Sequence, residues 1–129
     1  MKEPIKVLFV CHGNICRSPM GQYVLQHLVN KKGLSDCFYI DSAATSTEEI
    51  GCGVHRGTRG KLHQMNIYCG DHKAVQLKRS DYDKYDYLIG MDSWNIRNML
   101  RIVGSDPEGK ICKLLDFTDR KGEDIADPW

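Results

Sequence analysis

A cysteine and an arginine six positions apart are the residues of this sequence best suited to chemistry. Cys11 directly follows the apolar run 5–10, and Arg17 is the only arginine that lies six positions after any of the six cysteines. Gly13 lies between them, and Ser18 and Pro19 then open an amphipathic segment. A strand, a glycine-containing turn and a helix in this order are typical of an anion site at a helix N-terminus. The sequence therefore predicts a phosphate-binding loop.

The loop predicts both a binding site for a dianion and a nucleophile. The backbone N–H groups of the loop would point into the site, together with the first-turn donors of the helix. The loop residues are His12, Gly13, Asn14, Ile15, Cys16 and Ser18. Arg17 has a planar guanidinium that can hold two phosphate oxygens and the equatorial charge of the transition state. The positive helix end and Arg17 should favour the thiolate of Cys11, which makes it the candidate nucleophile.

The start of the helix suggests two roles for the hydroxyl of Ser18. We predict that Ser18 is the N-cap residue and that its hydroxyl also donates to the Cys11 sulfur when a phospho-cysteine breaks down. Pro19 would then take the first helical position, where no N–H is needed. Gly13 and Asn14 tolerate positive φ and would let the loop fold back.

Other interpretations of the loop remain open. Cys11 could be a buried residue at a strand end beside a surface arginine. A metal site formed by Cys11, His12 and Cys16 lacks a second ligand pair at zinc spacing. A nucleotide P-loop is excluded because no Gly-Lys-Ser/Thr follows.

Apolar runs alternate with helical patterns along the whole chain. The expected strands are 5–10, 38–40, 87–91 and 111–117, and the expected helices are 19–31, 55–65 and 93–102. This order predicts an α/β fold, with right-handed crossovers that put helices on both faces of a four-stranded parallel sheet in three layers. Residues 1–129 would form a single domain. Ligands bind at the carboxyl ends of such strands, where Cys11, Ser42 and Asp92 would meet.

Composition limits the partners and the compartment. A net charge of +1 argues against bulk nucleic-acid binding, and no apolar stretch approaches the roughly 20 residues of a membrane helix. The six cysteines show no pairing pattern and no signal peptide precedes them, so we expect reduced thiols and a cytoplasmic location.

The segment 10–20 resembles the signature of the low-molecular-weight protein tyrosine phosphatases. Later blocks of the sequence, 41–46, 70–74, 81–95 and 127–129, resemble that family in the same order, so the resemblance covers nearly the whole chain. It implies a protein tyrosine phosphatase that hydrolyses phosphotyrosine through a phospho-cysteine intermediate and needs no metal or cofactor. The substrate would be a phosphotyrosine protein or an aryl phosphate, with phosphate, sulfate or vanadate able to bind the loop. A monomer or weak homodimer is expected.

The resemblance also implies roles that the residue pattern alone does not assign. Asp127 matches the family's general acid, although an Asp-Pro pair near a chain end is usually an ordinary turn. Ser42 and His72, with Asn14 and Ser18, match a hydrogen-bond network that supports the loop. Asp92 matches an aspartate near the site, and it is equally well explained as a helix N-cap.

Cys16 matches a residue that protects the nucleophile of the family from oxidation. A disulfide between Cys11 and Cys16 would stop oxidation at a reversible stage. The alternative is that Cys16 is a small packing residue.

Two of the departures from the family concern the cover of the sheet and the pocket mouth. Relatives continue beyond the position of Trp129 with a final helix that covers one face of the sheet. We therefore expect either that this chain is a truncated form or that something else, such as a partner chain, covers that face. Glu48 stands where many relatives have an aromatic residue at the pocket mouth, which leaves Trp129 as the aromatic part of the pocket lining.

Three alternative functions follow from the same loop. A phosphoarginine phosphatase would carry threonine at the position of Ile15. A thiol-coupled arsenate reductase needs two relay cysteines in one segment, and Cys69 and Cys112 are far apart. A non-catalytic phosphate-binding module would lose the nucleophile or the acid, and both Cys11 and Asp127 are present.

Overall fold

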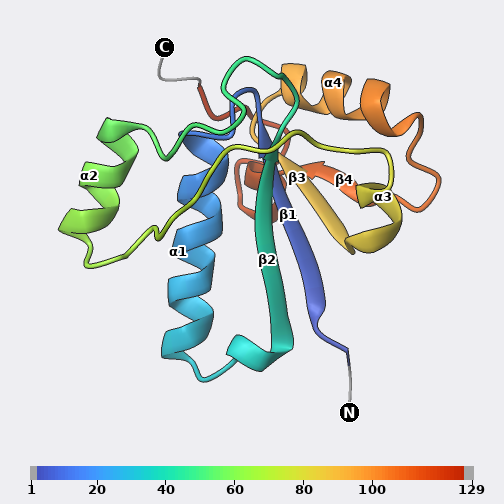
Figure 1. The fold of residues 1–129 in the computed structure, drawn as a ribbon. Helices are drawn as coiled ribbons and strands as arrows, with labels where there is room; N and C mark the ends of the chain where they lie inside the picture. Colours follow the sequence, from blue (N-terminus) through green and yellow to red (C-terminus); the bar gives the residue numbers. More distant parts are fainter. Residues whose placement is uncertain (1–2, 127–129) are drawn as a thin grey trace.

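The computed structural model describes residues 3–126 and contains one parallel β-sheet (Figure 1). The strand order is β2-β1-β3-β4, in which the central strand β1 pairs in parallel with both β2 and β3. The strands are β1 (Ile5–Cys11), β2 (Phe38–Ala44), β3 (Tyr87–Gly90) and β4 (Ile111–Lys113). The predicted α/β class and the four-stranded parallel sheet are confirmed.

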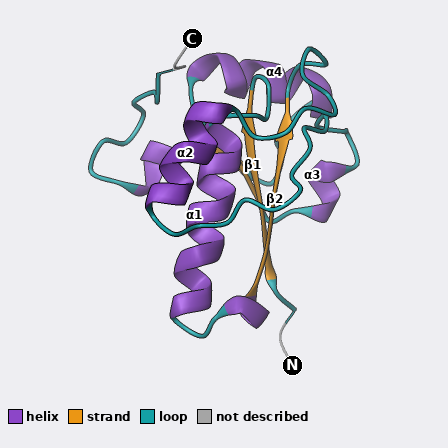
Figure 2. Ribbon diagram, turned by 60° about the vertical axis from the view of Figure 1, so that its left-hand side comes forward, coloured by secondary structure: helices purple, strands orange, loops and turns teal. Residues whose placement is uncertain are grey.

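Helices lie on both faces of the sheet, as predicted (Figures 1 and 2). Helix α1 packs on one face and α4 on the other, while α2 packs against α1. The helices are α1 (Arg17–Lys31), α2 (Arg56–Gln64), the short α3 (Asp81–Lys84) and α4 (Ser93–Val103), with 3₁₀ turns at Ser35–Cys37 and Leu114–Phe117. None of the helices in the described part is long and apolar enough to cross a membrane.

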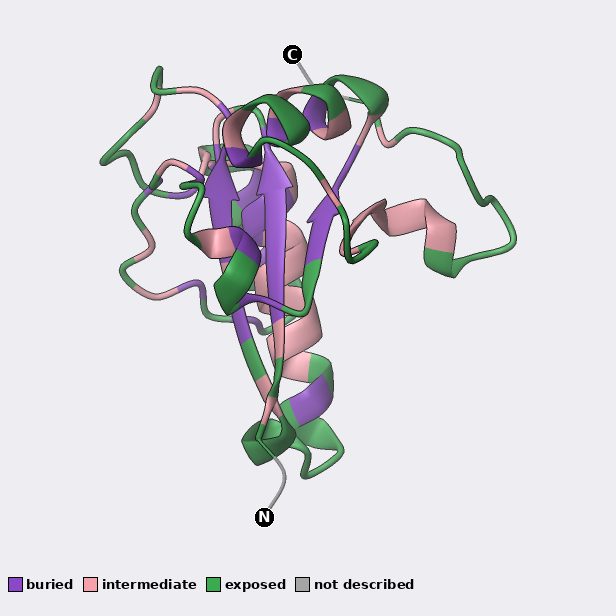
Figure 3. Ribbon diagram, turned by 90° about the vertical axis from the view of Figure 1, so that its right-hand side faces the viewer, coloured by how far each residue is buried: buried purple, intermediate pink, exposed green. Residues whose placement is uncertain are grey.

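The central strand is buried on both sides, which explains its unbroken apolar sequence. Leu8 and Val10 point into a cluster with Met99 of α4. Val7 and Phe9 alternate to the other face, where α1 packs. Figure 3 shows the buried residues concentrated on the strands between these two helical layers. A rigid strand therefore ends at Cys11 and holds the start of the phosphate-binding loop.

Some of the predicted element boundaries are wrong. The fourth strand ends at Lys113, because the Asp116 carboxylate accepts hydrogen bonds from the backbone N–H groups of Lys113 (2.9 Å) and Gly122 (2.8 Å) and closes a 3₁₀ turn. Helix α1 begins at Arg17, so its N-cap is Cys16 and not Ser18. Pro19 occupies the third helical position, which it can do because N–H groups of the first turn have no partner within the helix.

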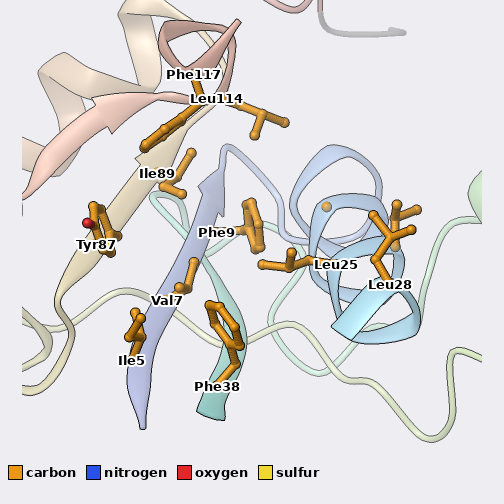
Figure 4. A pocket seen from close by; sticks show the side chains of 12 residues that line it. Ile5, Val7, Phe9, Leu25, Leu28, Phe38, Tyr87, Ile89, Leu114 and Phe117 are labelled. Atoms are coloured by element: carbon orange, nitrogen blue, oxygen red, sulfur yellow. The ribbon is translucent and has the colours of Figure 1, made fainter. Parts of the chain in front are cut away.

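A long apolar groove lies between α1 and the sheet (Figure 4). Its volume is about 450 Å³, and Leu28 and Phe117 at its border are 47% and 59% exposed. Its lining consists of Ile5, Val7, Phe9, Gly21, Val24, Leu25, Leu28, Phe38, Tyr87, Ile89, Leu114 and Phe117. The expectation that a further helix or a partner covers one face of the sheet stays a prediction.

Candidate active site

The loop that joins β1 to α1 surrounds a small pocket at the carboxyl edge of the sheet. The pocket has a volume of about 90 Å³ and is lined by Cys11, His12, Gly13, Ile15, Cys16, Arg17, Glu48 and Glu49. Sites for drug-sized ligands start near 300 Å³, so this pocket suits a group as small as a phosphate. The structure thus brings the predicted nucleophile and the predicted arginine into one pocket.

The backbone of the loop is turned so that its carbonyl groups bind the surrounding protein. The Asn14 carbonyl accepts from His72 Nε2 (2.8 Å), and the Ile15 carbonyl accepts from the His55 N–H (2.7 Å). The Cys16 carbonyl accepts from the N–H of Met20 (3.0 Å) within α1. In a planar trans peptide the N–H points opposite to the C=O. The N–H groups that follow these carbonyls are therefore directed toward the pocket, where an anion can accept from them.

A chain of hydrogen bonds runs from the protein interior to the nucleophile. Asn14 is completely buried with a left-handed φ of 58°, and its Oδ1 accepts from the Val75 N–H at 3.1 Å. Its Nδ2 donates to Ser18 Oγ at 2.8 Å, and Ser18 Oγ lies 3.0 Å from Cys11 Sγ. While Ser18 Oγ accepts from Asn14, its own hydrogen is available to donate to the sulfur. The Ser18 N–H, 3.4 Å from Cys11 Sγ, is a second donor directed at the sulfur.

His72 and Ser42 occupy different places relative to the loop. His72 contacts it directly through the Asn14 carbonyl. Ser42 is buried inside β2, opposite Phe9, and its hydroxyl donates to Oε1 of Gln22 in α1. It lies within the strand and not after it, which corrects the expected strand end at 40. Its side chain therefore contacts the helix that follows the loop.

Arg17 is held by an ion pair that sequence analysis left open. Its Nη1 donates to Asp92 Oδ2 at 2.7 Å and to the Ile125 carbonyl at 2.8 Å. The side chains of Arg17 and Asp92 are only 8% and 14% exposed. Asp92 Oδ1 also accepts from the Asn95 N–H at 2.7 Å and caps α4. Both interpretations of Asp92 are therefore correct, since one carboxylate caps the helix and orients the arginine.

Cys16 and His12 have side-chain partners that the sequence does not indicate. Cys16 Sγ accepts from Thr58 Oγ1 of α2 at 2.9 Å. His12 Nε2 lies 2.9 Å from Glu48 Oε2, and Glu49 lies beside Glu48 in the pocket lining. These contacts join segments about 40 residues apart, so no local sequence pattern indicates them.

Two predicted site residues, Asp127 and Trp129, lie outside the described residues. Glu48 lines the pocket as expected. Within residues 3–126 no group of three or more His, Cys, Asp or Glu side chains is placed to hold a metal ion. The metal site suggested for Cys11, His12 and Cys16 therefore has no support in this part of the chain.

Comparisons with known proteins agree with this geometry. The sequence profile of the family "Low molecular weight phosphotyrosine protein phosphatase" matches residues 6–129. The Saccharomyces cerevisiae protein of that name is 38% identical over 99% of this chain and 81% of its own length. The Bacillus subtilis low molecular weight protein-tyrosine-phosphatase YfkJ is 39% identical over 97% of this chain and 81% of its length. The YfkJ crystal structure superposes with a TM-score of 0.94 and covers 98% of this chain and 80% of that one.

Proposed function

This chain belongs to the low molecular weight phosphotyrosine protein phosphatases and is a cysteine-dependent protein tyrosine phosphatase, and we propose that Cys11, Arg17 and Asp127 carry out its reaction. The observation that supports this assignment is the buried Cys11 sulfur, which lies 3.0 Å from Ser18 Oγ in the same pocket as Arg17. Asp127 is assigned from the family resemblance.

In the first step, the Cys11 thiolate attacks phosphorus in line with the tyrosyl oxygen. The S–P bond forms as the P–O bond to tyrosine breaks, and Asp127 gives its proton to the leaving oxygen. Arg17 and the loop N–H groups hold the three equatorial oxygens, whose charge grows in the transition state. Asp92 and the Ile125 carbonyl keep the guanidinium of Arg17 oriented for this contact.

In the second step, water hydrolyses the phospho-cysteine. Asp127, now a carboxylate, takes a proton from the water as its oxygen bonds to phosphorus and the S–P bond breaks. The electron pair returns to Cys11 as a thiolate, which the hydroxyl of Ser18 stabilises by donating a hydrogen bond. Inorganic phosphate leaves, and Asp127 is protonated for the next cycle.

Replacement of Asp127 with alanine tests the acid role. We expect kcat on a phosphotyrosyl peptide to fall about 10²- to 10³-fold, since general acid–base catalysis contributes roughly that much. The loss on 4-nitrophenyl phosphate should be smaller, because its leaving group needs less protonation. Phosphate release is measured in EDTA with a thiol reductant, and Asp119→Ala at an exposed site is the matched control. An equal loss on both substrates, or no loss on the peptide, would contradict the assignment.

We further propose that Cys16 protects Cys11 from oxidation. Both thiols are free and line the same pocket. Peroxide would oxidise the Cys11 thiolate to a sulfenic acid and be reduced to water. Attack by Cys16 sulfur would then form the S–S bond and release the sulfenic oxygen as a second water.

Mild peroxide followed by mass spectrometry tests this protection. We expect a Cys11–Cys16 disulfide and recovery of activity with reductant. In Cys16→Ser we expect sulfinic acid on Cys11 and no recovery. Cys37→Ser, which removes an exposed thiol, serves as the control. Sulfinic acid on Cys11 of the unchanged protein would refute the proposal.

The substrate is proposed to be a phosphotyrosine protein whose phosphate enters the 90 Å³ pocket while the ring stays at its mouth. All six cysteines are free, which supports a reducing, cytoplasmic location. That the protein is a monomer or weak homodimer stays a prediction.

A further inference from the structure

The mouth of the phosphate pocket carries two adjacent carboxylates. Glu48 is exposed, and its Oε2 lies 2.9 Å from Nε2 of His12, which is also exposed. The stem of half-buried Glu49 covers Gly13, where an added Cβ would lie 3.4 Å from Glu49 Cγ. Both side chains belong to the pocket lining that surrounds the Cys11 sulfur. A group bound at this mouth therefore meets negative charge next to the phosphate.

The described lining offers little positive side-chain charge against these carboxylates. Among the described lining residues Arg17 is the only lysine or arginine, and it forms an ion pair with Asp92 at 2.7 Å. His12 can offset one carboxylate only when it is protonated. The partner of Glu49 is the Cys52 thiol, and that carboxylate raises the pKa of Cys52 through a hydrogen bond. A thiol brings no positive charge, so the mouth stays acidic.

Two carboxylates at the mouth weaken the approach of a phosphate dianion, and a cation on the substrate would offset this repulsion. The pocket has room for the phosphate but not for the residues on either side of the phosphotyrosine, which must lie over the mouth. The carboxylate of Glu48 is reachable there, since its side chain is 69% exposed. Charges at a rim act mainly on association and specificity.

We propose that Glu48 and Glu49 form a charge-selective mouth that recognises a lysine or arginine side chain next to the phosphotyrosine of the substrate. This inference rests on the proposed phosphatase function and names its substrate class. His12 holds Glu48 at the mouth and competes with the substrate cation for it. The alternative is a solvated surface pair with no effect on substrate choice.

Two phosphotyrosyl peptides that differ only in one residue beside the phosphotyrosine, lysine or glutamate, test the proposal. For the unchanged protein we expect kcat/KM to favour the lysine peptide about five- to tenfold at low ionic strength, the range that two exposed ion pairs can supply. The preference should be expressed mainly in KM and should shrink in about 0.5 M salt, where exposed charges are screened.

Variants identify the residues responsible. The double variant Glu48→Gln/Glu49→Gln should hydrolyse the two peptides at rates within about twofold of each other. Each single variant should lose part of the preference for the lysine peptide. Glu108→Gln removes an exposed carboxylate in the segment between α4 and β4 and should keep the full preference. Thermal unfolding of each variant shows that it is folded.

Three results would overturn the proposal. They are equal rates on both peptides for the unchanged protein, a preference for the glutamate peptide, and a lysine preference that persists in the double variant. Hydrolysis of 4-nitrophenyl phosphate, which has no neighbouring residue, reports the activity separately. Loss of turnover on this ester and on both peptides would refute the proposed function, which is a different outcome.

Discussion

Cys11→Ser should abolish turnover of a phosphotyrosyl peptide, with a loss on the order of 10⁴-fold or more, as expected for removal of a covalent nucleophile. A serine hydroxyl is a far weaker nucleophile than a thiolate, and the one imidazole among the described lining residues, that of His12, has its Nε2 2.9 Å from Glu48 Oε2 instead. The donors from Ser18 that stabilise a thiolate would instead face a neutral oxygen. The change is nearly isosteric at a residue that is 3% exposed, so the fold should persist.

Phosphate release in EDTA with reductant, together with calorimetric titration of vanadate or phosphate, measures this expectation. Cys11→Ser should retain anion binding, since Arg17 and the loop N–H groups are unchanged. Cys37→Ser replaces an exposed thiol away from the pocket and should behave like the unchanged protein. Turnover by Cys11→Ser above about a hundredth of the normal rate would exclude Cys11 as the nucleophile. An inactive unchanged protein that still binds phosphate would instead indicate a phosphate-binding module.

The fold could be predicted where the local sequence determines the secondary structure of a segment. The apolar run before Cys11 predicts a buried central strand, and helical patterns between strands predict the crossovers and the parallel sheet. The fourth strand was predicted too long because residues 114–117 are as apolar as a strand. The capping carboxylate of Asp116 ends the strand there, and that effect depends on the turn at Gly122.

The site was predicted where it is local in sequence and missed where distant segments meet. The loop from Cys11 to Ser18 is one continuous piece, so residue types and spacing define it. The partner of Arg17 is 75 residues away, and only the fold decides that Asp92 meets it. Ser18 was misplaced as the N-cap because the helix already begins at Arg17, and the Ser18 hydroxyl contacts Asn14 and the Cys11 sulfur instead. Nothing in the sequence assigned Glu49 to the pocket except its position next to Glu48.

Arg17→Lys should lower kcat/KM about 10³-fold, although it keeps the positive charge, because removal of one preorganised donor costs roughly 10² to 10³. One amino group of the guanidinium, Nη1, contacts both Asp92 and the Ile125 carbonyl, which fixes the plane of the whole group. A lysine has a single ammonium on a flexible stem. It cannot bind Asp92 and two phosphate oxygens in one geometry.

Asp92→Asn separates the orienting role of Asp92 from its capping role. Asparagine caps a helix about as well as aspartate, so α4 should remain intact and the loss should come from the ion pair. We expect kcat/KM to fall about tenfold, a typical effect of losing an orienting partner. Stability should also fall, because Arg17 is only 8% exposed and would lose its paired charge.

The double variant Arg17→Lys/Asp92→Asn shows whether the two residues act as one unit. Residues in direct contact are not additive, and Asp92 acts on the reaction only through the guanidinium it orients. The double variant should therefore be no slower than Arg17→Lys alone, as steady-state rates and anion affinity together would show. Additive losses would mean that Asp92 contributes to the reaction independently of Arg17. If Arg17→Lys kept more than about a tenth of the activity, a point charge would suffice and two-point binding by the guanidinium would be wrong.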